Sequence, residues 1–138
     1  MPNEICVIVG TRPGIIMMAP IIHALQAADH PHYVIHTGQH YSPEMDVELF
    51  EDLGLTVPVY HLKGAAEAQT HATKTARMME GCEAAFLERR PGVVLVNGDA
   101  NSNVAAALAD WTPVFGDGRA AERIVAHCAL LLEEGIPS

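Results

Sequence analysis

This chain of 138 residues has few cysteines, few aromatic residues and few basic residues, and each shortage argues against a class of protein. Its three cysteines, Cys6, Cys82 and Cys128, are far apart, which favours reduced core thiols over a disulfide or zinc framework. Eight Lys and Arg stand against 17 Asp and Glu, giving a formal charge of −9. Such a surface argues against nucleic acid and anionic membranes as partners.

Long apolar runs are also missing. No segment is apolar enough to span a bilayer, and no basic leader precedes the first apolar segment, so we expect a cytoplasmic protein without a membrane partner. Hydrophobic residues make up 49% of the chain and aromatic residues 5%. This composition favours a core of Ala, Val, Leu and Ile in helices and strands over a β-sandwich, and the length suits one domain.

Short apolar segments alternate with segments of helical periodicity. Strands are predicted at Ile5–Gly10, His32–Gly38, Val57–Leu62 and Val93–Asn97, and helices at Ile15–Ala28, Pro43–Leu53, Ala68–Arg89 and Ser102–Asp110. The alternation predicts right-handed βαβ units. We therefore expect an α/β fold: a single Rossmann-like, three-layer domain with a parallel sheet in the strand order 3-2-1-4 and helices on both faces.

The two edges of this sheet differ. Pro58 lies in the third strand, which favours an edge position. The fourth strand forms the other edge, and its apolar segment Val93–Val96 is predicted either to pair with a second copy of the chain or to be covered by Trp111–Phe115. Residues 111–138 are predicted to form a linker and one amphipathic helix that completes the domain begun by residues 1–110.

The first candidate site is the turn after the first strand, which reads Gly10-Thr11-Arg12-Pro13-Gly14. Gly10 permits a sharp turn, and Pro13 suits the start of a helix. The Arg12 guanidinium and the amides of the first helical turn can both face an anion. An ordinary turn with an exposed arginine explains the same pattern.

The second candidate turn, His36–Tyr41, follows the second strand and opens on the same rim of the sheet. Gln39 and His40 can hydrogen-bond a substrate, and His40 can transfer a proton. A polar loop without a function is the alternative.

The third candidate turn is Asn97–Ser102, after the fourth strand. In the expected strand order Asp99 lies near Arg12, where a carboxylate can act as a general base, bind a ribose or pair with the arginine. Alternatively, Asp99 or Ser102 only caps the following helix.

The eight histidines predict no metal site, because the pairs at His30-x-His32 and at His36 and His40 lack a cysteine or carboxylate at motif spacing. A hydrolase-like pair stays open as an alternative, without the sequence of a nucleophile elbow. Its candidates are Ser102 or Cys82 with His40, or a pair that includes His61 or His71.

Four segments, VIVGTRPGIIMMAPII, HTGQHYSPEM, FEDLGL and VLVNGDANS, resemble the N-terminal domain of the non-hydrolysing UDP-N-acetylglucosamine 2-epimerases. A fifth, VFGDGRAAERIV, resembles the end of that family, where a terminal helix returns to the N-terminal domain. The resemblance implies two Rossmann-like domains in a GT-B arrangement. It also implies a cofactor-free reaction that eliminates UDP and adds it back to an unsaturated sugar.

Carried over by motif, the resemblance implies that Arg12 contacts the diphosphate, that Asp99 is an active-site carboxylate and that Gln39 and His40 border the sugar. The ligand-binding residues that we expect for phosphate or a UDP-type molecule are Gly10, Thr11, Arg12, Pro13, Gln39, His40, Asn101 and Ser102.

Departures from the family pattern weaken the expectation of catalysis. The family has glutamate, lysine and threonine where this chain has Gly14, Met17 and Ala100, and the second domain is missing after Asp110–Phe115. We expect a truncated remnant, natural or engineered, that lacks epimerase activity and binds phosphate or nucleotide weakly. The alternatives are an engineered catalyst such as an ester hydrolase, and epimerase activity regained through oligomerisation.

Overall fold

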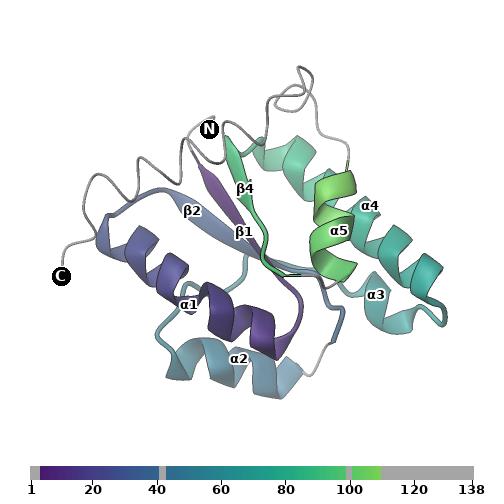
Figure 1. The fold of residues 1–138 in the computed structure, drawn as a ribbon, viewed down its shortest axis with the longest axis horizontal. Coiled ribbons are helices and arrows are strands. Elements are labelled where there is room, and N and C mark those ends of the chain that lie inside the picture. The colour runs from purple at the N-terminus through teal and green to yellow at the C-terminus, as the bar shows by residue number, and fades with distance from the viewer. Residues whose placement is uncertain (1–3, 41–42, 99–100, 110–138) are drawn as a thin grey trace.

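The computed structural model of the chain describes residues 4–40, 43–98 and 101–109, in which strands and helices alternate (Figure 1). The strands are β1 (Ile5–Val9), β2 (His32–His36), β3 (Tyr60–His61) and β4 (Val93–Leu95). The helices are α1 (Arg12–Ala27), α2 (Pro43–Asp52), α3 (Gly64–Glu67), α4 (His71–Arg89) and α5 (Asn101–Leu108).

The four described strands form one parallel sheet in the order β3-β2-β1-β4, which confirms the predicted order. Val7 in the centre of β1 is in register with Val34 of β2 and Leu95 of β4. Because β1 is flanked on both sides, all five of its residues are buried. The sheet places the carboxyl ends of β1, β2 and β4 at one rim.

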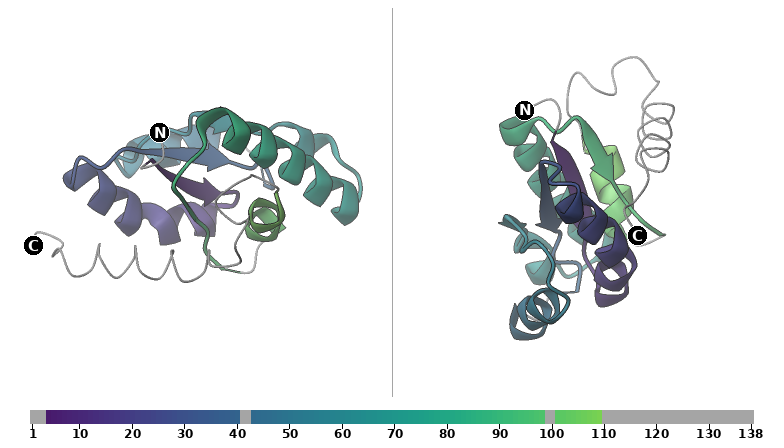
Figure 2. Two further views of the ribbon diagram at one scale, coloured as in Figure 1. Left: turned by 90° about the horizontal axis from the view of Figure 1, so that it is seen from above. Right: turned by 90° about the vertical axis from the view of Figure 1, so that its left-hand side faces the viewer.

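Helices cover both faces of the sheet, which confirms the three-layer fold (Figure 2). Ile5, Val7 and Val9 pack in a cluster with the buried residues of α1 and with Phe50 of α2. The alternate residues of β1, Cys6 and Ile8, pack instead with α4 and α5. This division follows from the two-residue period of a strand, which turns successive side chains to opposite faces.

The structure corrects two predicted elements. Pairing in the third strand is limited to Tyr60–His61, and Val57 and Val59 before it are exposed. The helix expected from Ala68 begins at His71, and a separate four-residue helix, α3, precedes it. The break has a local cause, since Ala68 is extended and Thr70 caps α4 by accepting the N–H of Thr73.

Two predictions depend on residues outside the described ranges. The linker and helix predicted in residues 111–138 lie there, so the domain boundary at residue 110 stays a prediction. Among the described strands, β4 is the edge next to β1, and Val96 after it is 42% exposed. The proposed cover, Trp111–Phe115, also lies outside the described residues, and the pairing of this edge stays a prediction.

Candidate functional site

The candidate site is the rim at the carboxyl ends of β1, β2 and β4, where three turns meet the start of α5. Gly10 is the point of closest approach: a Cβ there would overlap the side-chain oxygens of Thr37 and Ser102. These two oxygens, the hydroxyl pair, are 2.7 Å apart and hydrogen-bonded. Glycine at this position therefore lets segments from three parts of the sequence come together.

Gln39 holds the start of α5 in place. Its Oε1 accepts two hydrogen bonds from Ser102, one from the backbone N–H at 2.8 Å and one from the hydroxyl at 2.6 Å. A hydroxyl has one hydrogen to give, so the Thr37 hydroxyl is the donor within the hydroxyl pair. Gln39 thus satisfies one of the amides that a helix start leaves without an intrahelical partner.

A cavity of about 100 Å³ lies between the turn after β1 and the turn after β4. None of its described lining residues carries a charge; they are Gly10, Thr11, Pro13, Gly14, Met17, Asn97, Gly98, Ser102 and Asn103. The amide of Asn103 donates to the Asn97 carbonyl, whereas the buried Nδ2 of Asn97 has no hydrogen-bond partner among the described residues. A buried amide donor without a partner is unusual in a folded protein.

Arg12, the predicted anion ligand, lies outside this cavity. Its Nε is 3.5 Å from Asp46 Oδ1 on α2, and its side chain is 45% exposed. The predicted neighbour, Asp99, lies outside the described residues, so their proximity stays a prediction. The start of α1 offers few amides to an anion, because Pro13 has no N–H and Thr11 Oγ1 accepts the N–H of Gly14 at 3.2 Å.

The remaining predicted residues are only partly described. His40 is exposed, and its backbone N–H donates to the Gly10 carbonyl at 3.0 Å. The side chain of Asn101 lies outside the described part of the chain. The structure therefore brings Ser102 into contact with Gln39 and close to Gly10, and it leaves His40 at the surface.

Sequence reasoning missed a polar cluster beside the rim, formed by buried Asp46 and His36 with half-buried His61. Asp46 is 2% exposed, and its Oδ2 is 3.5 Å from His36 Nε2. The rings of His36 and His61 are stacked, with centroids 5.8 Å apart. One signal could have found Asp46: it precedes Phe50 by four residues and Leu53 by seven, so it lies on the apolar stripe of α2.

Burial shapes the protonation of both histidines. It lowers the pKa of His36 to about 4, while Asp46 raises that pKa and His61 lowers it. For His61, burial again lowers the pKa, Asp46 raises it and Lys63 lowers it. Both rings are therefore neutral near pH 7.

The hydrolase candidates do not come together in the described part of the chain. The Ser102 hydroxyl contacts Thr37, Gln39 and the Met78 sulfur, at 3.8 Å for the last. Cys82 is fully buried, which raises its pKa to about 12, so it is no thiolate near neutral pH. His71, at the start of α4, is exposed, and it is not among the described contacts of Ser102 or Cys82.

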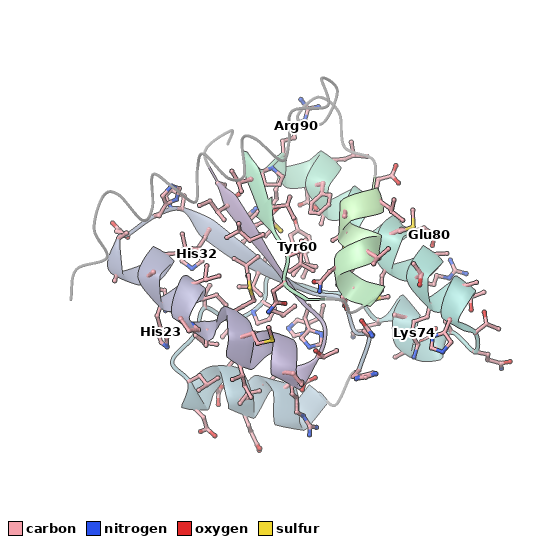
Figure 3. The ribbon with its side chains drawn as sticks, in the orientation of Figure 1. His23, His32, Tyr60, Lys74, Glu80 and Arg90 are labelled. Carbon is pink, nitrogen blue, oxygen red and sulfur yellow. The ribbon has the colours of Figure 1, made fainter. Side chains whose placement is uncertain are left out.

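A second, larger hollow of about 910 Å³ lies along α3 and α4. It is an open polar groove whose charged side chains include Arg77 and Glu80, which pair with each other at 2.8 Å. Figure 3 shows Lys74 and Glu80 on α4, far from His23 on α1. No three potential metal ligands gather within residues 4–40, 43–98 and 101–109, and none of the helices there is long and apolar enough to cross a membrane.

Comparison with known proteins identifies relatives of this site and fold. A family model described as UDP-N-acetylglucosamine 2-epimerase matches residues 23–111. The UDP-N-acetylglucosamine 2-epimerase of Methanocaldococcus jannaschii is 42% identical over 105 residues, which are 76% of this chain and 28% of that protein. The enzyme of Escherichia coli K12 is 36% identical over 109 residues, 77% of this chain and 28% of its own length.

Solved structures agree with the sequence matches. The Methanocaldococcus jannaschii epimerase in complex with UDP-GlcNAc and UDP superposes with a TM-score of 0.71 at 38% identity, covering 85% of this chain and 30% of that one. The Neisseria meningitidis epimerase bound to UDP-GlcNAc gives a TM-score of 0.69 at 29% identity, over 77% of this chain and 28% of that one. The chain thus spans less than a third of the length of these relatives.

Proposed function

The chain belongs to the UDP-N-acetylglucosamine 2-epimerase family, and from that premise we propose that it binds the phosphate side of a UDP-type ligand at the rim. Two solved relatives hold UDP or UDP-GlcNAc. The observation that carries the proposal is Arg12 in the first turn of α1, whose side chain is 45% exposed. Its chain neighbours Thr11 and Pro13 line a cavity whose described lining has no carboxylate. Arginine offers several donors to phosphate, and a helix start favours an anion.

The other residues of the rim have four different roles under this proposal. The Gly10 and Pro13 backbone shapes the turn, and the Thr11 hydroxyl and Asn97 Nδ2 supply donors from the cavity. Gln39 and Ser102 act on the ligand indirectly, because their hydrogen bonds to each other fix the start of α5. His40 and Asn101 border the same rim by their place in the sequence.

We expect binding to be weak. Pro13 supplies no amide, and the N–H of Gly14 is already accepted by Thr11, so the turn offers an anion fewer donors than its sequence suggests. One arginine and a few neutral donors support a Kd on the order of 1 mM, which corresponds to about 4 kcal/mol.

We propose that the 138-residue chain alone does not catalyse epimerisation. Elimination of UDP requires an acid and a base placed on the sugar within a dry cleft. The described lining of the cavity contains no ionisable side chain, and the hydroxyl of Ser102 is held by Gln39. A turnover of UDP-GlcNAc that is lost in Arg12→Ala would overturn this part of the proposal, and a rate that rises with the square of chain concentration would point to activity through oligomers.

The binding proposal is tested by two-dimensional ¹⁵N NMR of the full chain with UDP and, separately, with inorganic phosphate. We expect the amide signals of Gly10, Thr11, Arg12 and Gly14 to shift, with a Kd on the order of 1 mM. Arg12→Ala should weaken binding about tenfold, because a hydrogen bond to a charged group is lost. Arg77→Ala is the matched control, since it removes the same charge from an exposed position on α4. No shift at residues 10–14 in about 10 mM ligand would end the proposal.

A further inference from the structure

Asp46 is a nearly fully buried carboxylate that two basic side chains approach from different elements. Its Oδ1 is 3.5 Å from Arg12 Nε at the start of α1, and its Oδ2 is 3.5 Å from His36 Nε2 at the end of β2. Asp46 itself is 2% exposed. A buried carboxylate is costly unless positive charge and hydrogen bonds offset its desolvation, so the charge of these two neighbours decides what Asp46 does.

His36 does not supply the positive charge. The backbone N–H of Gly38 donates to His36 Nδ1 at 3.1 Å, which requires that Nδ1 carry no proton. The neutral ring then has its hydrogen on Nε2, the atom that faces Asp46. If Nδ1 were protonated, its N–H would face the N–H of Gly38, and neither donor would have an acceptor in this fully buried place. This unfavourable arrangement agrees with the low pKa of the ring.

Of the two basic side chains that approach Asp46 in the described part of the chain, Arg12 is therefore the one that keeps its charge at neutral pH. Other titratable groups near the cluster, within the described residues, are His61, whose pKa is lowered by burial, and Lys63, which also lowers the pKa of His61. Because Asp46 sits on the packed face of α2 and cannot follow a mobile partner, the contact constrains Arg12 more than it constrains Asp46.

The same cluster also anchors the loop after β2. His36 Nδ1 accepts the N–H of Gly38, and Gly38 packs so closely on the Leu62 carbonyl that a Cβ would overlap it. Together these two contacts fix the backbone of the loop where it follows β2. One residue later Gln39 holds the start of α5 through Ser102. Asp46 thus contacts both Arg12 and His36, and His36 in turn orients the loop after β2.

From this geometry we propose that Asp46 is the positioning residue of the rim: it orients the Arg12 guanidinium for an anion through one oxygen and supports the His36–Gly38 loop anchor through the other. The part concerning the anion rests on the proposed phosphate binding; the orientation of Arg12 in the free chain does not. Asp46 touches no ligand in this proposal and acts only through its two neighbours.

The first test needs no ligand. In ¹⁵N NMR of the full chain at neutral pH, the Arg12 Nε–H should give a resolved signal protected from exchange with water, and Asp46→Asn should abolish that protection. Asp52→Asn, the same change at an exposed position of α2, should leave it intact. An unprotected Arg12 Nε–H in the unsubstituted chain overturns the proposal even if Asp46→Asn does not fold.

The second test uses inorganic phosphate as the probe. Removal of a negative charge near an anion site would by itself tighten phosphate binding, so a loss of affinity is diagnostic of positioning. We expect Asp46→Asn to weaken binding about threefold to tenfold and Asp52→Asn to leave it unchanged. In an Arg12→Ala background, Asp46→Asn should cause no further loss of affinity. Unchanged or tighter binding in folded Asp46→Asn overturns the proposal.

The two proposals fail separately. If the unsubstituted chain and Arg12→Ala bind phosphate equally, the proposed function fails, and the Arg12 Nε–H signal still decides whether Asp46 orients the guanidinium. If Arg12→Ala weakens binding but Asp46→Asn only lowers the melting temperature, the binding proposal stands and the role of Asp46 is structural.

Discussion

Acidification from pH 7 to pH 4 should lower the free energy of unfolding, because the folded chain keeps His36 neutral at pH values at which the unfolded chain protonates it. His36 is fully buried at the end of β2, and burial lowers its pKa from 6.5 to about 4. In the unfolded chain the ring takes up a proton near pH 6.5, whereas in the folded chain it does so only near pH 4. The unfolded state therefore binds more protons between these values, and acid favours unfolding.

The magnitude follows from the shift. Each unit of pKa difference is worth about 1.4 kcal/mol, so a shift from 6.5 to about 4 corresponds to about 3 kcal/mol. The full contribution is present above pH 6.5, declines as the pH falls and is lost below about pH 4. A change of this size is a large part of the free energy of unfolding of a small domain.

Urea unfolding of the unsubstituted chain and of His36→Asn, each followed from pH 7 to pH 4, isolates this contribution. The asparagine carbonyl can accept the Gly38 N–H as Nδ1 does, and it does not titrate. Contributions from groups far from His36 cancel between the two chains, so the difference reports the replaced ring and its contacts. The stability advantage of the unsubstituted chain should shrink by about 3 kcal/mol. An advantage that stays constant over this range would refute the reasoning.

Three further predictions concern packing. Gly10→Ala should lower the free energy of unfolding by about 2–3 kcal/mol in urea titrations, because its Cβ would push the two hydroxyls of the pair apart. Gly14→Ala is the control: the atom nearest to its Cβ would be 3.2 Å away, so the free energy of unfolding should change by less than about 1 kcal/mol. Equal effects of the two substitutions would contradict this. Phe86→Ala should cost about 3–5 kcal/mol by the same assay, since Phe86 is fully buried between α4 and the sheet, and a cost under about 1 kcal/mol would contradict its place in the core. Those backbone amides of Val93–Val96 that do not bond to β1 should also be protected from hydrogen exchange. Their protection should depend on concentration if copies pair across β4 and not depend on it if residues 111–115 cover the edge; rapid exchange of these amides at all concentrations contradicts both.

The architecture could be predicted because its signals are local. The apolar run that became β1 and the helical periodicity that became α1 each extend over one element, and the handedness of βαβ units restricts how such elements assemble. The separation of α3 from α4 was missed because the apolar periodicity of the region continues across Thr70. Its cap depends on a side-chain geometry that the pattern does not contain.

The candidate site could be predicted only in outline. The turns after β1, β2 and β4 had to meet once the sheet was parallel, and Gly10, Gln39 and Ser102 do meet. Their roles at a ligand stay predictions, but the structure adds one that the sequence did not show: Gln39, expected at the sugar, accepts two hydrogen bonds from Ser102. A glutamine side chain offers the same groups to a ligand and to a helix start, and sequence does not distinguish these uses.

The sequence by itself therefore determined most of the elements, the strand order and the rim at which the three candidate turns meet. Tertiary structure alone decided that Arg12 contacts Asp46, that His36 is neutral and that Gln39 holds α5. The physical reason is the range of the interactions. Gln39 and Ser102 are 63 positions apart, and their contact depends on strand register, helix rotation and burial together, none of which is encoded in a local pattern of residues.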